Sequence, residues 1–376
     1  MSLPAGDAPV LVTGATGFLG REVVRRLLEA RRPVVALARA RAGEPAGHRV
    51  ARAVGWMVDG RRLDVVEGDL TLAQVLAPAD LARLRATVET VIHCAGDTTF
   101  FPEALETFRA GHVDGPRLLL RALAGGRLRR WAHVSTAFVC GRRTGLVREH
   151  EGDVGQTFHK VDLRFVRPSI VVGAAPATAG GIPANLFFAF IRLVALLGRL
   201  ARGAELPLRI AAAPGARFNV VPIDYVAMAI VALAEHAAAT RGTFHVVVSE
   251  PPTQEAMLAM IAGRLGVRGL RLVDGRAGAV ANLSGLEARM ARMLAPYREY
   301  LEQDVRFDDT GARAVLDRCQ IPPPVFDRAA VERLVELALS SPLPPRGPSR
   351  RSLPSWTSSP RATTRTRRPS MRFATP

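Results

Sequence analysis

The chain has 376 residues, of which 48% are hydrophobic and 23% charged, proportions typical of a soluble globular protein with one large and one smaller domain. Its start lacks the basic and apolar regions of a signal peptide, and no apolar run is long enough to span a bilayer. We therefore expect a cytoplasmic location. Three scattered cysteines without a CxxC pair, and histidines without ligand spacing, argue against a disulfide framework and against a metal site.

The formal net charge of +17 raises the question of nucleic-acid binding, because clustered arginines neutralise phosphates. Of the 51 basic residues, only Lys160 is a lysine, so arginine replaces lysine throughout the chain and not in one selected patch. Residues 341–376 hold eight arginines and no acid in a stretch rich in Pro, Ser and Thr. This composition predicts a disordered basic tail. We favour a solvated appendage over an RNA-binding arm, and nucleic acid is not an expected partner.

The segment VLVTGATGFLG, residues 10–20, joins a β-branched run to a helical pattern through a glycine-rich turn. Gly14 permits the tight turn, Gly17 lets the backbone approach phosphates, and Gly20 allows close packing of helix on strand. Backbone N–H groups at such a helix start bind the pyrophosphate of a dinucleotide, whereas an ordinary βα turn is the minority alternative. The predicted phosphate-binding residues are Gly14, Thr16, Gly17, Phe18, Leu19 and Gly20.

Strand patterns alternate with helical patterns through the first half of the chain, which predicts a doubly wound parallel sheet of the α/β, Rossmann-like class. We assign residues 8–173 to a dinucleotide-binding domain that residues 218–250 complete. Ligands of such sheets lie beyond the carboxyl ends of the strands. After the opening strand and helix, the expected strands are 33–39, 63–70, 90–96, 130–136 and 163–173, and the expected helices are 76–86 and 108–123.

Residues 174–217 and 251–340 are predicted to form a smaller, mostly helical substrate-binding portion. Its apolar segment Asn185–Leu200 is too short, and too interrupted by Arg192, to span a membrane. We interpret this segment as a buried or groove-lining helix, with a membrane-surface helix as the less favoured alternative. Membrane association is therefore not indicated.

Three strand ends carry further candidates for cofactor binding. Arg39 follows the second strand, where arginine accommodates a 2′-phosphate, so NADP is favoured over NAD. Asp69, with Leu70, would lie beside the adenine, and the small residues Ala95 and Gly96 would pass close to the cofactor. The alternatives are coincidence in an arginine-rich chain and plain strand-end turns.

Taken in order, TGATGFLG, VVALAR, EGDL, VIHCAGDTTF, HVSTAFVCG, RPSIVVG and VPIDYV resemble the extended short-chain dehydrogenase/reductase superfamily, in its fatty acyl-CoA reductase and thioester reductase branch. This resemblance implies an NADPH-dependent oxidoreductase of lipid metabolism that reduces an acyl thioester, on CoA or a carrier protein, to an aldehyde or alcohol. It also implies that Thr136, with Ser135 beside it, hydrogen-bonds the substrate carbonyl, and that Pro168 of RPSIVVG lies at the cofactor.

The chain departs from the family at the catalytic Tyr-x-x-x-Lys pair, in which tyrosine transfers the proton and lysine lowers its pKa. None of the three tyrosines precedes the single lysine at the required spacing. A phenylalanine also replaces the tyrosine of the STAYV motif, and a histidine stands where the family usually has asparagine. The residues concerned are Tyr225, Tyr297, Tyr300, Lys160, Phe138 and His112.

Only residues 142–162 separate the STAFVCG motif from the next strand, and they must hold both an active-site loop and a crossover. A crossover helix and a loop of about 10 residues each leave no room for the family's long tyrosine-bearing helix. We infer that this helix is missing, and its loss should expose apolar surface. His159 or Lys160 could substitute as the proton donor, although a solvated loop pair is the favoured interpretation.

Several hypotheses follow from this pattern. The first is an NADPH-dependent acyl-thioester reductase whose turnover is reduced because the Tyr-x-x-x-Lys pair is absent. Others are a non-catalytic NADP-binding sensor or scaffold, another dehydrogenase or epimerase activity of the same superfamily, and nucleic-acid binding through the tail. A sequence error or a decayed gene would also account for the missing helix and the unusual tail.

Overall fold

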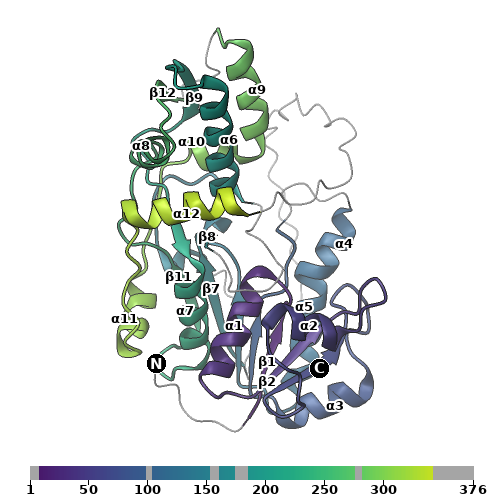
Figure 1. The fold of residues 1–376 in the computed structure, drawn as a ribbon. Helices are drawn as coiled ribbons and strands as arrows, with labels where there is room; N and C mark the ends of the chain where they lie inside the picture. Colours follow the sequence, from purple (N-terminus) through teal and green to yellow (C-terminus); the bar gives the residue numbers. More distant parts are fainter. Residues whose placement is uncertain (1–7, 99–103, 153–160, 174–184, 276–281, 342–376) are drawn as a thin grey trace, which may run out of the picture. The chain divides into compact units, whose positions relative to one another are not determined.

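A seven-stranded parallel sheet runs in the order β3-β2-β1-β4-β5-β7-β11 (Figure 1). The strand order reverses between β1 and β4, which pair in register at the centre of the sheet. The computed structural model describes residues 8–98, 104–152, 161–173, 185–275 and 282–341, and within them the predicted doubly wound sheet is confirmed. Its strands are β1 (Val10–Thr13), β2 (Val34–Ala38), β3 (Leu63–Glu67), β4 (Thr90–His93), β5 (Arg130–Val134), β7 (Asp162–Pro168) and β11 (Gly242–Val246).

Helices cover both faces of this sheet because the strands bury side chains on both sides. Val10 and Val12 lie in one hydrophobic cluster, and Leu11 lies in another on the opposite face. The first cluster takes side chains from α1 (Phe18–Glu29), α2 (Ala46–Val54), α7 (Ile223–Glu235) and α11 (Thr310–Arg318), and the second from α3 (Pro78–Thr87) and α5 (Gly115–Ala124).

A third hydrophobic cluster lies apart from the two that sandwich the sheet. Its central helix is α6 (Leu186–Ala201), whose first turn is capped by the Asn185 side chain accepting from the Phe188 N–H at 3.2 Å. Phe187, Phe188 and Ile191 of α6 are fully buried, so it is a core helix. Among the described residues no helix is long and apolar enough to cross a membrane. The same region contains β8 (Ile170–Val172), β9 (Leu208–Ala212), β10 (Val220–Pro222), α8 (Gln254–Arg264), β12 (Leu270–Asp274), α9 (Gly285–Leu294) and α12 (Arg328–Ser340).

The helix predicted at 108–123 extends over 105–124 and contains a π-helical turn. It consists of α4 (Leu105–Arg109), the π turn η1 (Ala110–Asp114) and α5. At the start of α5, a β-carbon on Gly115 would lie 1.9 Å from the Leu70 carbonyl oxygen, so glycine is required for the contact with the end of β3. Widened turns of this kind often occur at functional sites.

Several short elements were not predicted from the sequence. α2 lies in a stretch interpreted as polar and glycine-containing, yet Ala46, Val50 and Val54 recur every four residues and are buried. β9 pairs with β12, and β6 (Gly145–Val147) pairs with β13 (Val305–Phe307), each across a long separation in sequence. The predicted disordered tail lies outside the described residues except for Ser341, as do His159 and Lys160. The proposed domain division stays a prediction.

Arginines satisfy the carboxyl-terminal end of α7, where the last carbonyls of a helix lack partners. The buried Arg164 guanidinium donates to the carbonyls of Leu233 (2.7 Å) and Ala234 (3.1 Å). Glu235 closes the helix and accepts two bonds from Arg32, at 2.7 and 2.9 Å, with both side chains buried. This ion pair ties α7 to the loop between α1 and β2.

We expect Glu235→Gln to lower the free energy of unfolding by about 3 kcal/mol or more, because Arg32 would keep a buried charge without its counter-ion. Glu44→Gln is the matched control, since Glu44 pairs with Arg52 on the surface and its loss should cost less than about 1 kcal/mol. Urea unfolding of both variants measures the difference. Equal losses in the free energy of unfolding would show that burial does not make the Arg32–Glu235 ion pair more stabilising than the exposed Arg52–Glu44 pair.

Candidate functional site

At the turn after β1, backbone segments approach one another so closely that no side chain fits between them. Gly14 has a φ of +73°, and a β-carbon there would lie 2.6 Å from the backbone nitrogen of Ala95. A β-carbon on Gly20 would lie 2.1 Å from the Gly14 carbonyl oxygen. The glycines predicted from the sequence therefore allow α1 to start directly against the ends of β1 and β4.

The amino-terminal end of α1 has the features of an anion-binding site. Gly17 is its N-cap and supplies no side-chain hydrogen bond, and no acidic residue lies in the first turn. The first N–H groups of a helix have no intrahelical partner and carry a partial positive charge. Gly17 is exposed and Thr16, Phe18 and Leu19 are partly exposed, so a phosphate would meet these N–H groups without displacing a protein acid.

The ends of β2 and β3 place Arg39 beside Asp69. The two side chains form a long ion pair of 3.4 Å, and the Arg39 side chain is 55% exposed. Asp69 also accepts hydrogen bonds from the N–H and the hydroxyl of Thr71, at 2.9 and 2.8 Å. Burial raises the pKa of Asp69, but these bonds and the Arg39 charge outweigh it, so the pKa lies below its ordinary value. Leu70, next in sequence, is buried against Gly115.

His112 holds the loop that follows β4. Its Nε2 accepts a hydrogen bond from the Asp97 N–H at 2.9 Å, and its Nδ1 donates to the Phe108 carbonyl at 2.8 Å. A β-carbon on Gly96 would lie 3.4 Å from the same Nε2. The π turn of residues 110–114 carries this imidazole, which therefore holds the Asp97 backbone and lies close to Gly96.

Thr136 stands at the carboxyl end of β5 as the N-cap of the 3₁₀ turn η2 (Ala137–Cys140). Its hydroxyl oxygen accepts from the Phe138 N–H at 3.2 Å, and the residue is exposed. Within the described part of the chain its hydroxyl proton has no acceptor, so it is free to be donated to a ligand. Ser135 is held by its N–H to the Val166 carbonyl at 2.8 Å, and Pro168 is buried where β7 ends opposite Val246.

All predicted site residues therefore lie at the carboxyl ends of the sheet strands or at the start of α1. The structure brings Gly14 to Ala95 and Arg39 to Asp69 by direct contact, whereas Thr136 bonds locally to Phe138 and Pro168 pairs with Val246 of β11. Among the described residues, no cluster of His, Cys, Asp and Glu could hold a metal ion.

Two histidines beneath this edge, one buried (His93) and one partly buried (His133), were missed by sequence reasoning. His93 Nδ1 lies 2.8 Å from the Thr13 hydroxyl, and its ring stacks on that of His133 at 4.9 Å between centroids. Burial lowers the pKa of His93 well below its ordinary value and that of His133 to about 4. Both are therefore neutral near pH 7, and they form a polar row across β1, β4 and β5.

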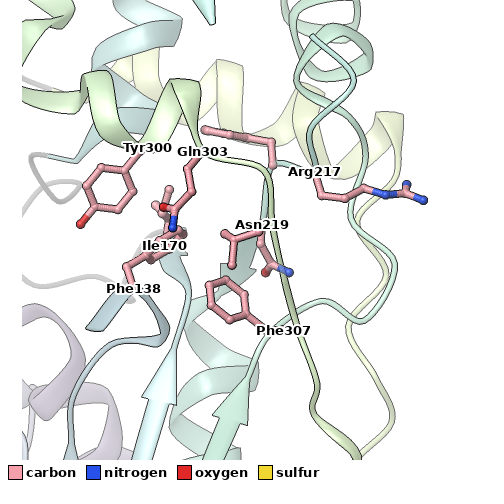
Figure 2. Close-up of a pocket in the computed structure, with 9 residues that line it drawn as sticks. Phe138, Ile170, Arg217, Asn219, Tyr300, Gln303 and Phe307 are labelled. Carbon is pink, nitrogen blue, oxygen red and sulfur yellow. The ribbon is translucent and has the colours of Figure 1, made fainter. Parts of the chain in front are cut away.

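A small pocket lies between η2 and the carboxyl-terminal part of the chain (Figure 2). Its volume of about 10 Å³ would hold one water molecule. Asn219 forms its polar wall, accepting from the Ser169 hydroxyl at 2.7 Å and donating to the Val248 carbonyl at 2.7 Å. The pocket is lined by Phe138, Ile170, Arg217, Phe218, Asn219, Tyr300, Gln303, Val305 and Phe307.

The crossover from β5 to β7 contains no α-helix in its described residues. It holds β6 and the 3₁₀ turn η3 (Glu149–Gly152), while residues 153–160 lie outside the description. The tyrosines are elsewhere: Tyr225 is buried in α7 and contacts Arg313 at 3.0 Å, Tyr297 ends the 3₁₀ turn η4 (Ala295–Tyr297), and Tyr300 lies in α10 (Arg298–Glu302).

Residues 12–157 match the family model described as "Male sterility protein", an NAD-binding family. Fatty acyl-CoA reductase 1 of Xenopus laevis is 27% identical over 149 residues, which cover 36% of this chain and 29% of that protein. The L-2-aminoadipate reductase large subunit of Penicillium chrysogenum is 34% identical over 139 residues, covering 35% of this chain and 10% of that protein. The matches thus span less than a third of either relative.

The fold similarity extends further along the chain than these matches. The solved terminal R domain from the myxalamid PKS-NRPS biosynthetic pathway superposes with a TM-score of 0.67, at 19% identity, over 90% of this chain and 92% of that domain. Residues 12–157 are therefore similar to an NAD-binding family, and the chain as a whole shares its fold with the solved R domain. Its amino-terminal part is an NAD(P)-binding domain.

We expect Gly20→Ala to weaken dinucleotide binding strongly and to lower the free energy of unfolding by about 2 kcal/mol or more, because the new methyl group would overlap the Gly14 carbonyl. Gly47→Ala is the control. No atom lies within 4 Å of a β-carbon at that position in α2, so its stability should rise by about 0.5–1 kcal/mol. Urea unfolding and calorimetric titration of both variants test this expectation, and unchanged binding in Gly20→Ala would contradict it.

Proposed function

We propose that this chain is an NADPH-dependent reductase of fatty acyl thioesters, carried on CoA or on a carrier protein, with an aldehyde or alcohol as product. The observation that carries the proposal is the convergence of an uncapped helix start, a half-exposed arginine and an exposed threonine hydroxyl at one edge of the sheet. The similarity of the chain to fatty acyl-CoA reductase 1 and to the solved R domain supports a thioester as the substrate. We expect it to act in the cytoplasm.

The residues present fit a phosphorylated dinucleotide. The pyrophosphate would meet the N–H groups of the Gly14–Gly20 turn, where the first turn of α1 offers no competing acid. Arg39 would pair with the 2′-phosphate in place of its long contact with Asp69. Asp69 and Leu70 would border the adenine, and Ala95, Gly96 and Pro168 would line the path of the cofactor. When bound, NADPH supplies the hydride for the reduction.

Thr136 would stabilise the reacting carbonyl. Its hydroxyl oxygen already accepts the Phe138 N–H, which fixes its orientation and leaves its proton for the carbonyl oxygen of the substrate. The exposed position beyond β5 gives a thioester access to this proton, and Ser135 stands beside it as a second hydroxyl. This arrangement favours charge development on the carbonyl oxygen without any metal ion.

A dinucleotide titration followed by a turnover assay on the same sample tests the proposal. We expect saturable binding of NADPH and its oxidation in the presence of a long-chain acyl-CoA or an acyl carrier protein. Binding without turnover on either class of thioester would favour a non-catalytic sensor or scaffold, which the absence of the Tyr-x-x-x-Lys pair also favours. No binding of any dinucleotide would contradict both functions.

We expect Arg39→Ala to weaken NADPH binding by about 10- to 100-fold and to leave NADH binding unchanged, because only NADPH carries the 2′-phosphate that Arg39 would bind. Arg52→Ala removes a similarly exposed arginine that pairs with Glu44, and it should affect neither coenzyme. Calorimetry with both coenzymes provides the measurement. Equal weakening of NADPH and NADH in Arg39→Ala would show that this residue does not select the cofactor.

A further inference from the structure

Residues 298–312 hold the described part of the crossover between β5 and β7 against the rest of the protein. The Gln303 side-chain amide donates to the carbonyls of Gly141 and Arg143, both at 2.7 Å. β13 then pairs in parallel with β6, and the Gly145 N–H donates to the Asp304 carbonyl at 2.8 Å. The segment that follows η2 therefore takes its backbone partners from a part of the chain about 160 residues further on.

Glu149 closes the same connection at its other end. Its carboxylate is buried and accepts from the backbone N–H groups of Gly311 (2.8 Å) and Ala312 (3.2 Å), at the start of α11, and of His245 (2.7 Å). A β-carbon on Gly311 would lie 2.4 Å from this carboxylate. Residues 298–312 are thus fixed on both sides of the crossover rather than lying loosely over it.

These contacts place Tyr300 against Phe138, two residues after Thr136, whose hydroxyl is proposed to bind the carbonyl. The Tyr300 ring packs on the Phe138 ring with 4.7 Å between centroids, and Phe307 packs on the same ring at 5.3 Å. The backbone N–H of Phe138 is the group that donates to the Thr136 hydroxyl oxygen. Figure 2 shows the Tyr300 hydroxyl directed away from Asn219.

Carbonyl reduction needs a proton donor that is a stronger acid than an aliphatic alcohol. Hydride addition places negative charge on the carbonyl oxygen, and a positioned acid that protonates it contributes about 10²- to 10⁴-fold in rate. Thr136 and Ser135 can donate hydrogen bonds but are weak acids. A phenol has an ordinary pKa of about 10 and is a common general acid. Burial, with the nearby Glu299 and Cys140, raises the pKa of Tyr300, so the phenol is protonated at neutral pH and is a weaker acid than a solvated phenol.

We propose that Tyr300 is the proton donor of the reaction, supplied by residues 298–312, the segment that holds the described part of the crossover. This inference rests on the proposed thioester reduction. The hydride adds to the carbonyl carbon, the carbon–oxygen π bond breaks, and the oxygen takes the phenolic proton, which forms a hemithioacetal. Tyr300 is left as a phenolate and recovers its proton when the hemithioacetal loses its hydroxyl proton and the thiolate departs to give the aldehyde. Tyr300 thus assists both steps, and the departing thiolate is protonated by solvent.

The first test compares Tyr300→Phe with Tyr297→Phe. Tyr297 lies three residues earlier, is partly buried and packs against the cluster around α6, so its loss controls for packing in this segment. We expect Tyr300→Phe to lower kcat by about 10²-fold or more while NADPH affinity and thermal stability stay unchanged. Tyr297→Phe should retain its kcat. Equal kcat values for wild type and Tyr300→Phe would overturn the proposal.

The second test does not depend on turnover. With three tyrosines in the chain, phenolate absorbance can be titrated in the wild type and, after subtraction of the Tyr300→Phe curve, assigned to Tyr300. The oxidised nicotinamide ring carries a positive charge that the reduced ring lacks. The Tyr300 pKa should therefore be lower with NADP⁺ than with NADPH, by about one pH unit or more.

The two tests separate the two proposals. A wild-type protein that reduces no thioester, yet whose Tyr300 responds to the oxidation state of the coenzyme, would overturn the proposed function and support the placement of Tyr300 at the reacting end of the site. Active wild type whose Tyr300 titrates identically with both coenzymes would support the function and overturn the role of Tyr300.

Discussion

The close approach of backbone to backbone at Gly14 is the constraint on which the rest of the structure depends. Because the β-carbon positions of Gly14 and Gly20 are filled by the backbones of Ala95 and of Gly14 itself, α1 starts at the very end of β1. That start lies where the strand order reverses, so the helix terminus and the ends of β4 and β5 share one edge. The Ala95 N–H in turn reaches the Thr13 hydroxyl at 3.2 Å, and Thr13 contacts His93. The glycines thus set both the site and the polar row beneath it.

Arginine in this chain has structural uses that account for part of its high content. Arg164 satisfies carbonyls at the end of α7, Arg130 donates to the Glu235 carbonyl at 2.7 Å, and Arg32 pairs with the Glu235 side chain. One guanidinium offers five donors in a planar fork and stays charged when buried, so it can hold several carbonyls at once. Part of the positive charge therefore binds carbonyls and a carboxylate within the fold. For this reason the net charge is a poor guide to the ligands of this protein.

The sequence predicted best those features that depend on neighbouring residues. The sheet strands, the glycine turn and the strand-end position of Arg39 follow from local pattern, and the structure has them close to where they were expected. The pairing of β6 with β13 joins short strands about 160 residues apart, for which no local pattern exists. The role proposed for Thr136 could be inferred only from family resemblance, because a hydroxyl residue at a strand end is common. No sequence pattern identified Tyr300 as a candidate, since its contact with Phe138 arises from tertiary packing alone.

The described part of the crossover between β5 and β7, residues 135–152 and 161, holds no α-helix, and its contacts with the carboxyl-terminal part of the chain follow from this. A helix between β5 and β7 would satisfy its own backbone and pack on the sheet, whereas the short segment observed leaves its polar groups to be paired from elsewhere. Gln303, β13 and the start of α11 supply those partners. The loop after Thr136 is therefore held by residues 298–312, the same segment that carries Tyr300, whose ring packs on Phe138. The proposed proton donor would thus be positioned by the packing that also orders this loop, without any change to the sheet.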